Sequence, residues 1–272
     1  MPLDRDRLVT LLEESGCVAA GDEADELLRA ARGEERWLDV AVARRRQGEP
    51  LAWICGTAEI DGLRLRIDPG VYVPRRWQTP MVARRASSLL VRGGTAIDLC
   101  AGAGTIAALL QRADPGARVL ATEVAPLAVA CARSNGVEVL AGDLFEPLPA
   151  ALAGAVDVIT AVAPYVPTGS LPLLPRDTLA HEPIGALHGG RDGLATIRRI
   201  VLAAPTWLRR GASLVLEHGP DQEAAVAELL AAAGFVGAER IVDPDGDCCG
   251  TSAQRTPRPG RHISATFGPQ GG

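Results

Sequence analysis

The stretch Ile97-Asp98-Leu99-Cys100-Ala101-Gly102-Ala103-Gly104-Thr105 decides the fold of this chain. Its apolar first half is typical of a buried strand, and the pattern that follows Thr105 predicts a helix. Between them, Gly102 and Gly104 let the backbone turn tightly and approach a ligand closely, because glycine has no Cβ. A strand, a glycine turn and a helix in this order are typical of open α/β sheets, which bind ligands at the carboxyl ends of their strands.

Strands and helices alternate on the C-terminal side of this stretch. The residue pattern predicts helices at 105–112, 126–133, 194–203 and 221–233, and strands at 96–100, 118–122, 137–140, 156–160 and 213–217. Strands that alternate with helices of about 10 to 15 residues form βαβ units and a mostly parallel sheet. A last pair of strands, near Arg240 and at 263–267, is joined by a loop at 244–261. We expect this pair to be antiparallel.

The N-terminal part has a different pattern. Leucines recur at three-to-four spacing over residues 4–47, which predicts helices, and Gly21-Asp22 and Gly33 divide the run into three. From Ala58 the apolar period becomes two, and Asp61-Gly62 marks a tight hairpin turn. A further short strand is expected at Val71-Tyr72-Val73. The expected parts are a helical domain at 1–57, a hairpin connector at 58–78, an α/β domain at 79–267 and a disordered tail at 268–272.

Composition excludes several classes of protein. Of the 272 residues, 47% are hydrophobic and 22% are charged, as in soluble globular proteins. No apolar run reaches the roughly 18 residues of a membrane span, and the charged start of the chain is unlike a secretion signal, so we expect a cytoplasmic protein. A net charge of −5 argues against nonspecific nucleic-acid binding.

The six cysteines do not have the spacing of a metal site, so no metal is expected. They are typical of buried or incidental thiols in an intracellular chain. The adjacent Cys248-Cys249 falls in the loop expected at 244–261, where these thiols could be reactive.

Three acidic residues follow successive strands. Glu123 ends the second strand, where its carboxylate can accept hydrogen bonds from both hydroxyls of a ribose, each contributing about 1.5–3 kcal/mol. Asp143 follows the third strand and is placed to accept from an adenine amino group, while Leu144 packs on the base. Asp98 lies in the first strand, where a carboxylate suits a cationic aminoacyl group.

Two ligands compete for this site. Gly102-x-Gly104-x-x-Ala107 with Glu123 formally fits a dinucleotide fingerprint. A pyrophosphate would then lie on the helix N-terminus, but the carboxylate of Asp98 suits the cationic part of S-adenosylmethionine better. Bland alternatives remain: Asp98 could cap the turn, Asp143 could be a turn residue, and Glu123 could be a surface charge. The residues favour S-adenosylmethionine, with S-adenosylhomocysteine as its product.

Several further motifs point to one family. They are Gly48-Glu49-Pro50-Leu51, residues 68–75, residues 142–145, Pro164-Tyr165-Val166-Pro167 and His181-Glu182-Pro183. Together they resemble the HemK/PrmC-type protein-(glutamine-N5) methyltransferases, over about residues 1–267. The resemblance implies a Rossmann-like, seven-stranded class I methyltransferase domain, preceded by a small helical domain and a β-hairpin connector. It also implies S-adenosylmethionine as cofactor and a release-factor glutamine as the family's acceptor.

The chain departs from the family pattern twice. Val162-Ala163-Pro164-Tyr165 stands where the family has Asn-Pro-Pro-Tyr, and Gln78-Thr79 stands where it usually has Thr-Glu. In the family, the Asn side chain and a neighbouring backbone carbonyl are thought to hold the amide nitrogen, and Val162 cannot accept a hydrogen bond. We therefore expect a divergent member with an altered acceptor: another amide, an amine, a hydroxyl or a small metabolite. The alternative is a repurposed enzyme of other sulfonium chemistry, or an inactive binding protein.

The resemblance places the following residues in the site. Ala163, through its backbone carbonyl, Pro164 and Tyr165 are expected to be catalytic and to form the acceptor wall. Val162, Glu182, Pro183 and Trp77 are expected to contact the substrate, and His181 or His188 could act as a base. The partner is a release-factor-like protein or a small molecule, with no nucleic acid and no membrane. The expected cofactor-binding residues are Asp98, Cys100, Gly102, Gly104, Thr105, Glu123, Val124, Asp143 and Leu144.

Overall fold

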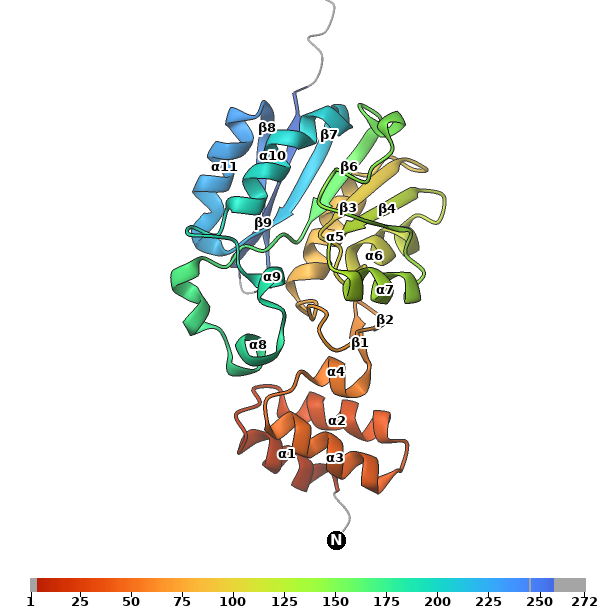
Figure 1. Cartoon of the computed structure of the whole chain (residues 1–272), viewed down its shortest axis with the longest axis vertical. Helices are drawn as coiled ribbons and strands as arrows, with labels where there is room; N and C mark the ends of the chain where they lie inside the picture. The colour runs from red at the N-terminus through yellow and green to blue at the C-terminus, as the bar shows by residue number, and fades with distance from the viewer. Residues whose placement is uncertain (1–3, 245, 257–272) are drawn as a thin grey trace, which may run out of the picture.

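A computed structural model describes residues 4–244 and 246–256 (Figure 1). One end of the molecule is a helical bundle of α1 (Arg5–Glu13), α2 (Ala20–Ala31), α3 (Glu35–Arg46) and the short α4 (Leu51–Cys55). Leu8, Leu12 and Leu27 are fully buried within it. The three expected helices form, but the first break lies before Gly21-Asp22, because Gly16 takes a left-handed φ of 83° just after α1.

The expected hairpin joins this bundle to the sheet. β1 (Thr57–Ile60) pairs antiparallel with β2 (Leu63–Arg66). Asp61 and Gly62 have φ values of 51° and 73°, and two positive φ values in succession are the requirement of a tight hairpin turn. The strand expected at Val71-Tyr72-Val73 does not form. Instead, a side chain bonds to the backbone of this segment: Trp53 Nε1 donates to the Val71 carbonyl at 2.9 Å.

A seven-stranded sheet forms the larger part of the molecule. Its first five strands are parallel, as expected, and β9 is antiparallel to both of its neighbours. In spatial order the strands are β5 (Val139–Ala141), β4 (Arg118–Glu123), β3 (Thr95–Leu99), β6 (Val156–Ala161), β7 (Leu208–Glu217), β9 (Cys248–Arg255) and β8 (Phe235–Val242).

Helices cover both faces of this sheet. On one face lie α5 (Gln78–Leu89), α6 (Thr105–Ala113) and α7 (Pro126–Ser134), and on the other lie α10 (Ala195–Trp207) and α11 (Glu223–Ala232) (Figure 1). Two short helices, α8 (Arg176–His181) and α9 (Ile184–Leu187), belong to the long connection between β6 and α10. In the described part of the chain no helix is both long and apolar enough to span a bilayer.

The C-terminal part differs from the prediction. β9 lies within the stretch expected to be a loop, and residues 263–267 and the tail at 268–272 fall outside the described residues. Cys248 and Cys249 are buried at the start of β9, and burial raises the pKa of the Cys249 thiol to about 11. The loop expected around these two residues is therefore wrong, whereas their burial agrees with the expectation of buried thiols. A buried thiol with a raised pKa, such as that of Cys249, is a poor nucleophile at neutral pH.

Candidate active site

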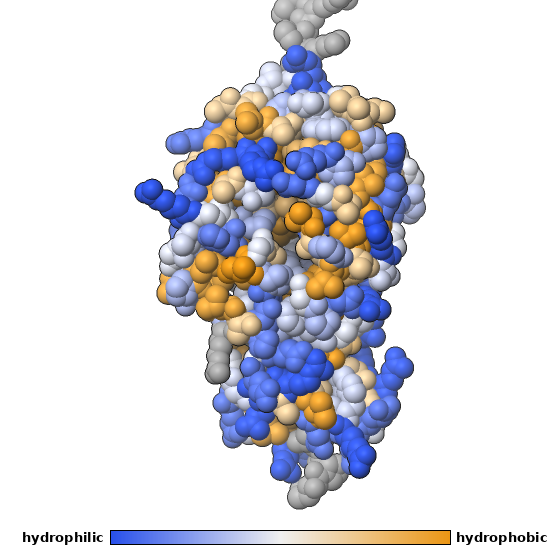
Figure 2. Space-filling view, in the orientation of Figure 1, coloured by the Kyte–Doolittle hydropathy of each residue, from blue (hydrophilic) through white to orange (hydrophobic). Residues whose placement is uncertain are grey.

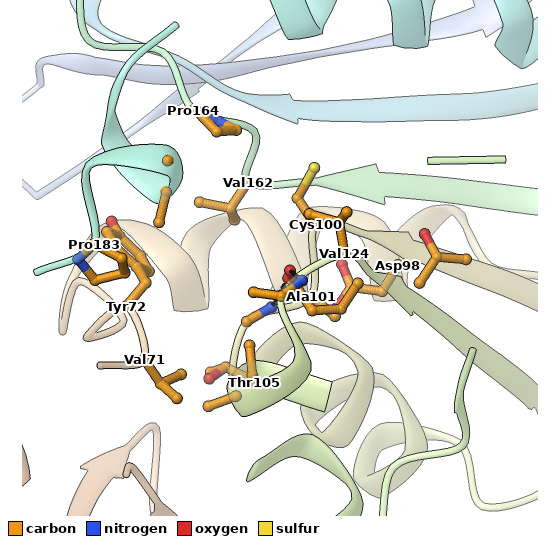
Figure 3. Close-up of a pocket in the computed structure, with 18 of the residues that line it drawn as sticks. Val71, Tyr72, Asp98, Cys100, Ala101, Thr105, Val124, Val162, Pro164 and Pro183 are labelled. Carbon is orange, nitrogen blue, oxygen red and sulfur yellow. Dashed lines mark hydrogen bonds between the residues drawn. The ribbon is translucent and has the colours of Figure 1, made fainter. Parts of the chain in front are cut away.

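A cavity of about 280 Å³ opens at the carboxyl ends of β3, β4, β5 and β6. Its walls come from the glycine turn after β3, from the residues that end or follow the other three strands, and from the segment between the hairpin and α5 (Figure 3). Figure 2 shows hydrophobic surface on both sides of a hollow in the middle of the larger domain. The position is the one at which open α/β sheets bind ligands.

The two glycines of the turn have different surroundings. Gly102 has a φ of 56° and lines the cavity, and a Cβ added there would have no atom within 4 Å. Gly104 begins α6 with a φ of 80°, and its added Cβ would lie 2.7 Å from Val137 Cγ2. Gly104 does not lie on the cavity wall, contrary to expectation. Gly102 leaves room for a ligand, whereas Gly104 leaves room for the packing of α6.

Glu123 lies on the cavity wall with its carboxylate already oriented. Its Oε2 accepts from the Gly102 N–H at 2.9 Å, and its Oε1 accepts from the Ala125 N–H at 2.8 Å. The residue is 8% exposed. Each carboxylate oxygen has a second lone pair, so both oxygens can still accept hydroxyl hydrogens from a ligand.

Asp98 is buried in β3 and also lines the cavity. The Thr160 hydroxyl donates to its Oδ1 at 2.8 Å, and the Ala107 N–H donates to its Oδ2 at 3.2 Å. Burial raises the pKa of this carboxyl to about 7, against the effect of the two hydrogen bonds. A cation in the cavity would favour the ionised form of Asp98.

Asp143 has a partner that the sequence does not indicate. Arg199 of α10 donates from Nη2 to Asp143 Oδ2 at 2.6 Å, and both side chains line the cavity. Leu144 follows with a left-handed φ of 48° and is buried against the same wall. The ion pair places the carboxylate at the end of the cavity farthest along the sheet from β6, next to the apolar side chain of Leu144.

The end of the cavity beside β6, where we expect the acceptor, is mainly apolar. Val162 follows β6 and lies between Tyr72 and Pro183 on one side and Cys100 on the other, with Pro164 beyond it (Figure 3).

Three buried threonine hydroxyls from different parts of the cavity wall have no partner in the described part of the chain; they belong to Thr79, Thr105 and Thr122. Buried hydroxyls are rarely left unsatisfied, which sets these three apart from the other polar groups of the wall.

No family model matches the chain, but individual proteins do. It is 39% identical over 194 residues to the release factor glutamine methyltransferase of Mycolicibacterium smegmatis, covering 70% of this chain and 68% of that protein. It is 37% identical over 235 residues to the 4-amino-L-phenylalanine/4-methylamino-L-phenylalanine methyltransferase of Streptomyces pristinaespiralis, covering 82% and 79%. The chain belongs to the release factor glutamine methyltransferase family.

A solved structure agrees with the fold. The T. thermophilus 16S rRNA N2 G1207 methyltransferase, in complex with AdoMet and guanosine, has a TM-score of 0.51 at 16% identity, covering 75% of this chain and 46% of that one. It confirms the expected class I methyltransferase fold. Membership of the family confirms the enzyme class and the cofactor S-adenosylmethionine. S-adenosylmethionine, and not the dinucleotide that the sequence left open, is therefore the cofactor.

Four residues that we expected to be catalytic or to contact the substrate are not among the residues that line this cavity. After β6 the chain stays extended, so side chains alternate between opposite sides: Val162 and Pro164 line the cavity, whereas Ala163 and Tyr165 do not. The Tyr165 hydroxyl instead donates to Glu217 Oε1 at 3.2 Å. The other two are Glu182, which lies behind the wall, and Trp77, which is 66% exposed on a groove beside α2 and the hairpin.

Glu182 does not line the cavity but bonds to the segment that contains the cavity residue Tyr72. Its Oε2 accepts from the Val73 N–H at 3.1 Å, and its Oε1 accepts from Arg75 Nη1 at 3.0 Å. The Arg75 guanidinium in turn lies 4.9 Å from the centre of the Tyr72 ring. Burial holds the pKa of the Tyr72 phenol well above its ordinary value, so it stays protonated. Glu182 therefore positions Tyr72, a cavity residue that the sequence includes in an expected strand and in the family motif at 68–75 but does not single out as a site residue.

Neither candidate base lies on the cavity wall. His188 is within 2.8 Å of the Thr168 hydroxyl, and His181 packs edge-on against Trp53. The wall instead contains most of the residues that the sequence does predict: Asp98, Cys100, Gly102, Thr105, Glu123, Val124, Asp143, Leu144 and Pro183, together with Val162 and Pro164.

Proposed function

We propose that this methyltransferase transfers the methyl group of S-adenosylmethionine to an amine nitrogen on an apolar, ring-sized body. The observation that carries the proposal is Val162 on the cavity wall, where the family resemblance calls for an Asn. An amide nitrogen is a weak nucleophile because its lone pair is delocalised into the carbonyl, and it needs hydrogen-bond acceptors to fix it. An aromatic amine keeps more of its lone pair and is uncharged at neutral pH.

The residues of the cavity fit the cofactor. Glu123 would accept the ribose hydroxyls, Asp98 would face the cationic aminoacyl part, and Asp143 with Leu144 would hold the adenine. Their charges and the unpartnered hydroxyls of Thr105 and Thr122 match a ligand with several donors and one cation. When bound, S-adenosylmethionine supplies an electrophilic methyl group. The protein's part is to hold the acceptor nitrogen in line with it, since positioning supplies much of the rate.

The relatives support two kinds of acceptor. The protein of Streptomyces pristinaespiralis is named for an amine on a phenyl ring, and the apolar end of this cavity, with Tyr72, Val162 and Pro183, suits such a ring. The protein of Mycolicibacterium smegmatis is named for a release-factor glutamine, which makes that side chain the second candidate. The glutamine amide needs a hydrogen-bond acceptor at residue 162, whereas the ring amine does not.

One assay separates them. The full chain is incubated with methyl-labelled S-adenosylmethionine and either 4-amino-L-phenylalanine or a release-factor fragment that contains the acceptor glutamine. We expect label and the mass of one added methylene on the ring amine, and little on the fragment. Label on the glutamine alone would overturn the amine proposal and leave the second candidate in its place.

A further inference from the structure

At the acceptor end of the cavity, Thr79 is a buried polar side chain whose hydroxyl has no partner. The residue lies in the first turn of α5, is 2% exposed, and its hydroxyl makes no hydrogen bond within the described part of the chain. It lines the same cavity as Val162. Leaving a buried hydroxyl unsatisfied costs about 1–3 kcal/mol, so the hydroxyl points to a group supplied by a ligand.

The packing of α5 places Thr79 near Val162. Thr79, Val82, Ala83 and Ala86 are all buried and follow the three-and-four spacing of a single helix face. Val162 packs against the apolar cluster that contains Val82 and Ala83. Thr79 lies one turn before those two residues on the same face, so the residue lies on the β6 side of the cavity.

The two departures from the family pattern thus meet on one wall. Val162 replaces the Asn, and Thr79 stands where the second residue of Thr-Glu is usual. An amide and a carboxylate are exchanged for an isopropyl group and a single hydroxyl. The wall keeps one small polar group beside a wider apolar surface, which matches an acceptor with one N–H to satisfy next to an apolar body.

We propose that Thr79 is the residue that positions the acceptor nitrogen: its hydroxyl oxygen accepts one amine N–H and so turns the lone pair toward the methyl group. This inference rests on the proposed amine acceptor. In the reaction the nitrogen forms a bond to the methyl carbon, the S–C bond breaks with its electron pair staying on sulfur, and one N–H proton leaves to solvent. A primary or secondary amine has the N–H that this contact requires, and a tertiary amine does not.

Two variants of the full chain test the role of the hydroxyl. Thr79→Val keeps the shape and removes the hydroxyl, whereas Thr79→Ser keeps the hydroxyl and removes a methyl group. With 4-amino-L-phenylalanine as probe, we expect Thr79→Val to lower kcat by about tenfold or more, as loss of one hydrogen bond implies. Thr79→Ser should stay within about threefold of wild type. The Kd of S-adenosylhomocysteine should be the same for all three proteins, which a merely structural defect would not leave intact.

Thr105→Val is the matched control. Its hydroxyl is equally buried and unpartnered, but it lies on α6 beside the glycine turn, so this variant should weaken S-adenosylhomocysteine binding instead. Unchanged kcat in Thr79→Val, with a normal melting temperature, would overturn the inference. If Thr79→Val melts early, Thr79→Ala takes its place in the comparison with Thr79→Ser.

The two proposals fail separately. If wild type methylates the amine and Thr79→Val does so equally well, only the role of Thr79 is wrong. If wild type methylates only the glutamine of the release-factor fragment, the amine proposal is wrong, and Thr79→Val is then compared on that fragment. Equal rates there would overturn the role of Thr79 as well, and an enzyme that methylates neither acceptor overturns both.

Discussion

The carboxylate of Glu123, at the end of β4, accepts a hydrogen bond from the backbone N–H of Gly102 at 2.9 Å. This contact ties the end of one strand to the glycine turn that follows its neighbour. It also fixes the direction of a carboxylate that is almost completely buried on the cavity wall. The same side chain therefore shapes the glycine turn and is oriented to receive a ligand.

Glu123→Ala should weaken cofactor binding. The variant removes the acceptor for two backbone N–H groups and, in our proposal, for the ribose hydroxyls. Hydrogen bonds to a charged group contribute about 1.5–3 kcal/mol each, so we expect the Kd of S-adenosylhomocysteine, measured by calorimetry, to rise by one to two orders of magnitude. Glu138→Ala, which changes an exposed carboxylate at the start of the neighbouring strand, should leave the Kd alone. Equal affinity in both variants would contradict the assignment.

Cofactor binding should depend on pH through Asp98. Because burial raises the pKa of this carboxyl to about 7, the free protein carries a proton there at lower pH, and a cationic ligand must displace it. Affinity for S-adenosylmethionine should therefore rise as pH increases toward about 7 and then level off, with proton release below that pH. Calorimetry in two buffers of different ionisation enthalpy measures the release. Asp98→Asn should abolish it, and release that persists in this variant would assign the proton to another group.

The same group makes stability depend on pH. In the unfolded chain Asp98 has the ordinary aspartate pKa of 3.8, and in the folded protein its pKa is about 7, so between these values the folded state binds more protons than the unfolded state. The free energy of unfolding contributed by Asp98 must then fall as pH rises from about 4 to 7. Glu217, whose pKa burial also raises to about 7, acts in the same direction. Urea denaturation of wild type and Asp98→Asn at several pH values isolates the part due to Asp98.

Much of this site could be predicted from the sequence because its chemistry is local. The glycine turn and the acidic residues at successive strand ends follow from the order of strand, turn and helix, and the parallel sheet then brings those ends together. Arg199 could not be found this way, since its contact with Asp143 depends on how α10 packs on the sheet. The sequence motif also does not tell on which side each of its residues lies: side chains of an extended chain alternate, and Val162 and Pro164 line the cavity whereas Tyr165 does not.

The C-terminal strands illustrate a second limit. β9 contains Gly250, Thr251, Ser252 and Gln254, and this polar sequence resembles a loop. It is a buried strand because β7 and β8 pair with it on both sides. An added Cβ on Gly250 would lie 2.4 Å from the Leu216 carbonyl oxygen, so close strand packing, and not local propensity, selects the residue. Such a strand can be recognised only from the three-dimensional structure, in which the neighbouring strands pair with it.

Val162→Asn should restore activity toward an amide. The new side chain supplies an acceptor on the cavity wall where the family resemblance calls for one, and removing a well-placed polar contact of this kind commonly costs about 10²–10³ in rate. We expect methylation of the release-factor glutamine fragment, measured as transfer of label, to increase by a substantial part of that factor. Val162→Ala widens the cavity without adding an acceptor and should show no increase. If both variants behave like wild type, the side chain at residue 162 is not what limits amide methylation.

Gly104→Ala should mainly lower stability, whereas Gly102→Ala should mainly lower cofactor affinity. Both residues have left-handed φ values, so each alanine carries a backbone cost of about 1–2 kcal/mol. At residue 104 the new Cβ also lies 2.7 Å from Val137 Cγ2, and overpacking of this kind costs about 1–3 kcal/mol more. Gly104→Ala should therefore lose more stability in urea denaturation. At residue 102 the methyl group meets open space on the cavity wall, so Gly102→Ala should instead lose affinity for S-adenosylhomocysteine.

Val137→Ala provides the decisive comparison for Gly104. Removing both γ-methyl groups of Val137 takes away the atom nearest to the new Cβ, so the 2.7 Å contact disappears in the double variant. The backbone cost and the milder contacts with Val137 Cβ at 3.1 Å and Ala132 Cβ at 3.2 Å remain. A double-mutant cycle should show a favourable coupling of about 1 kcal/mol or more between residues 104 and 137. Additive losses would mean that the contact with the Val137 γ-methyl group is not what requires glycine at residue 104.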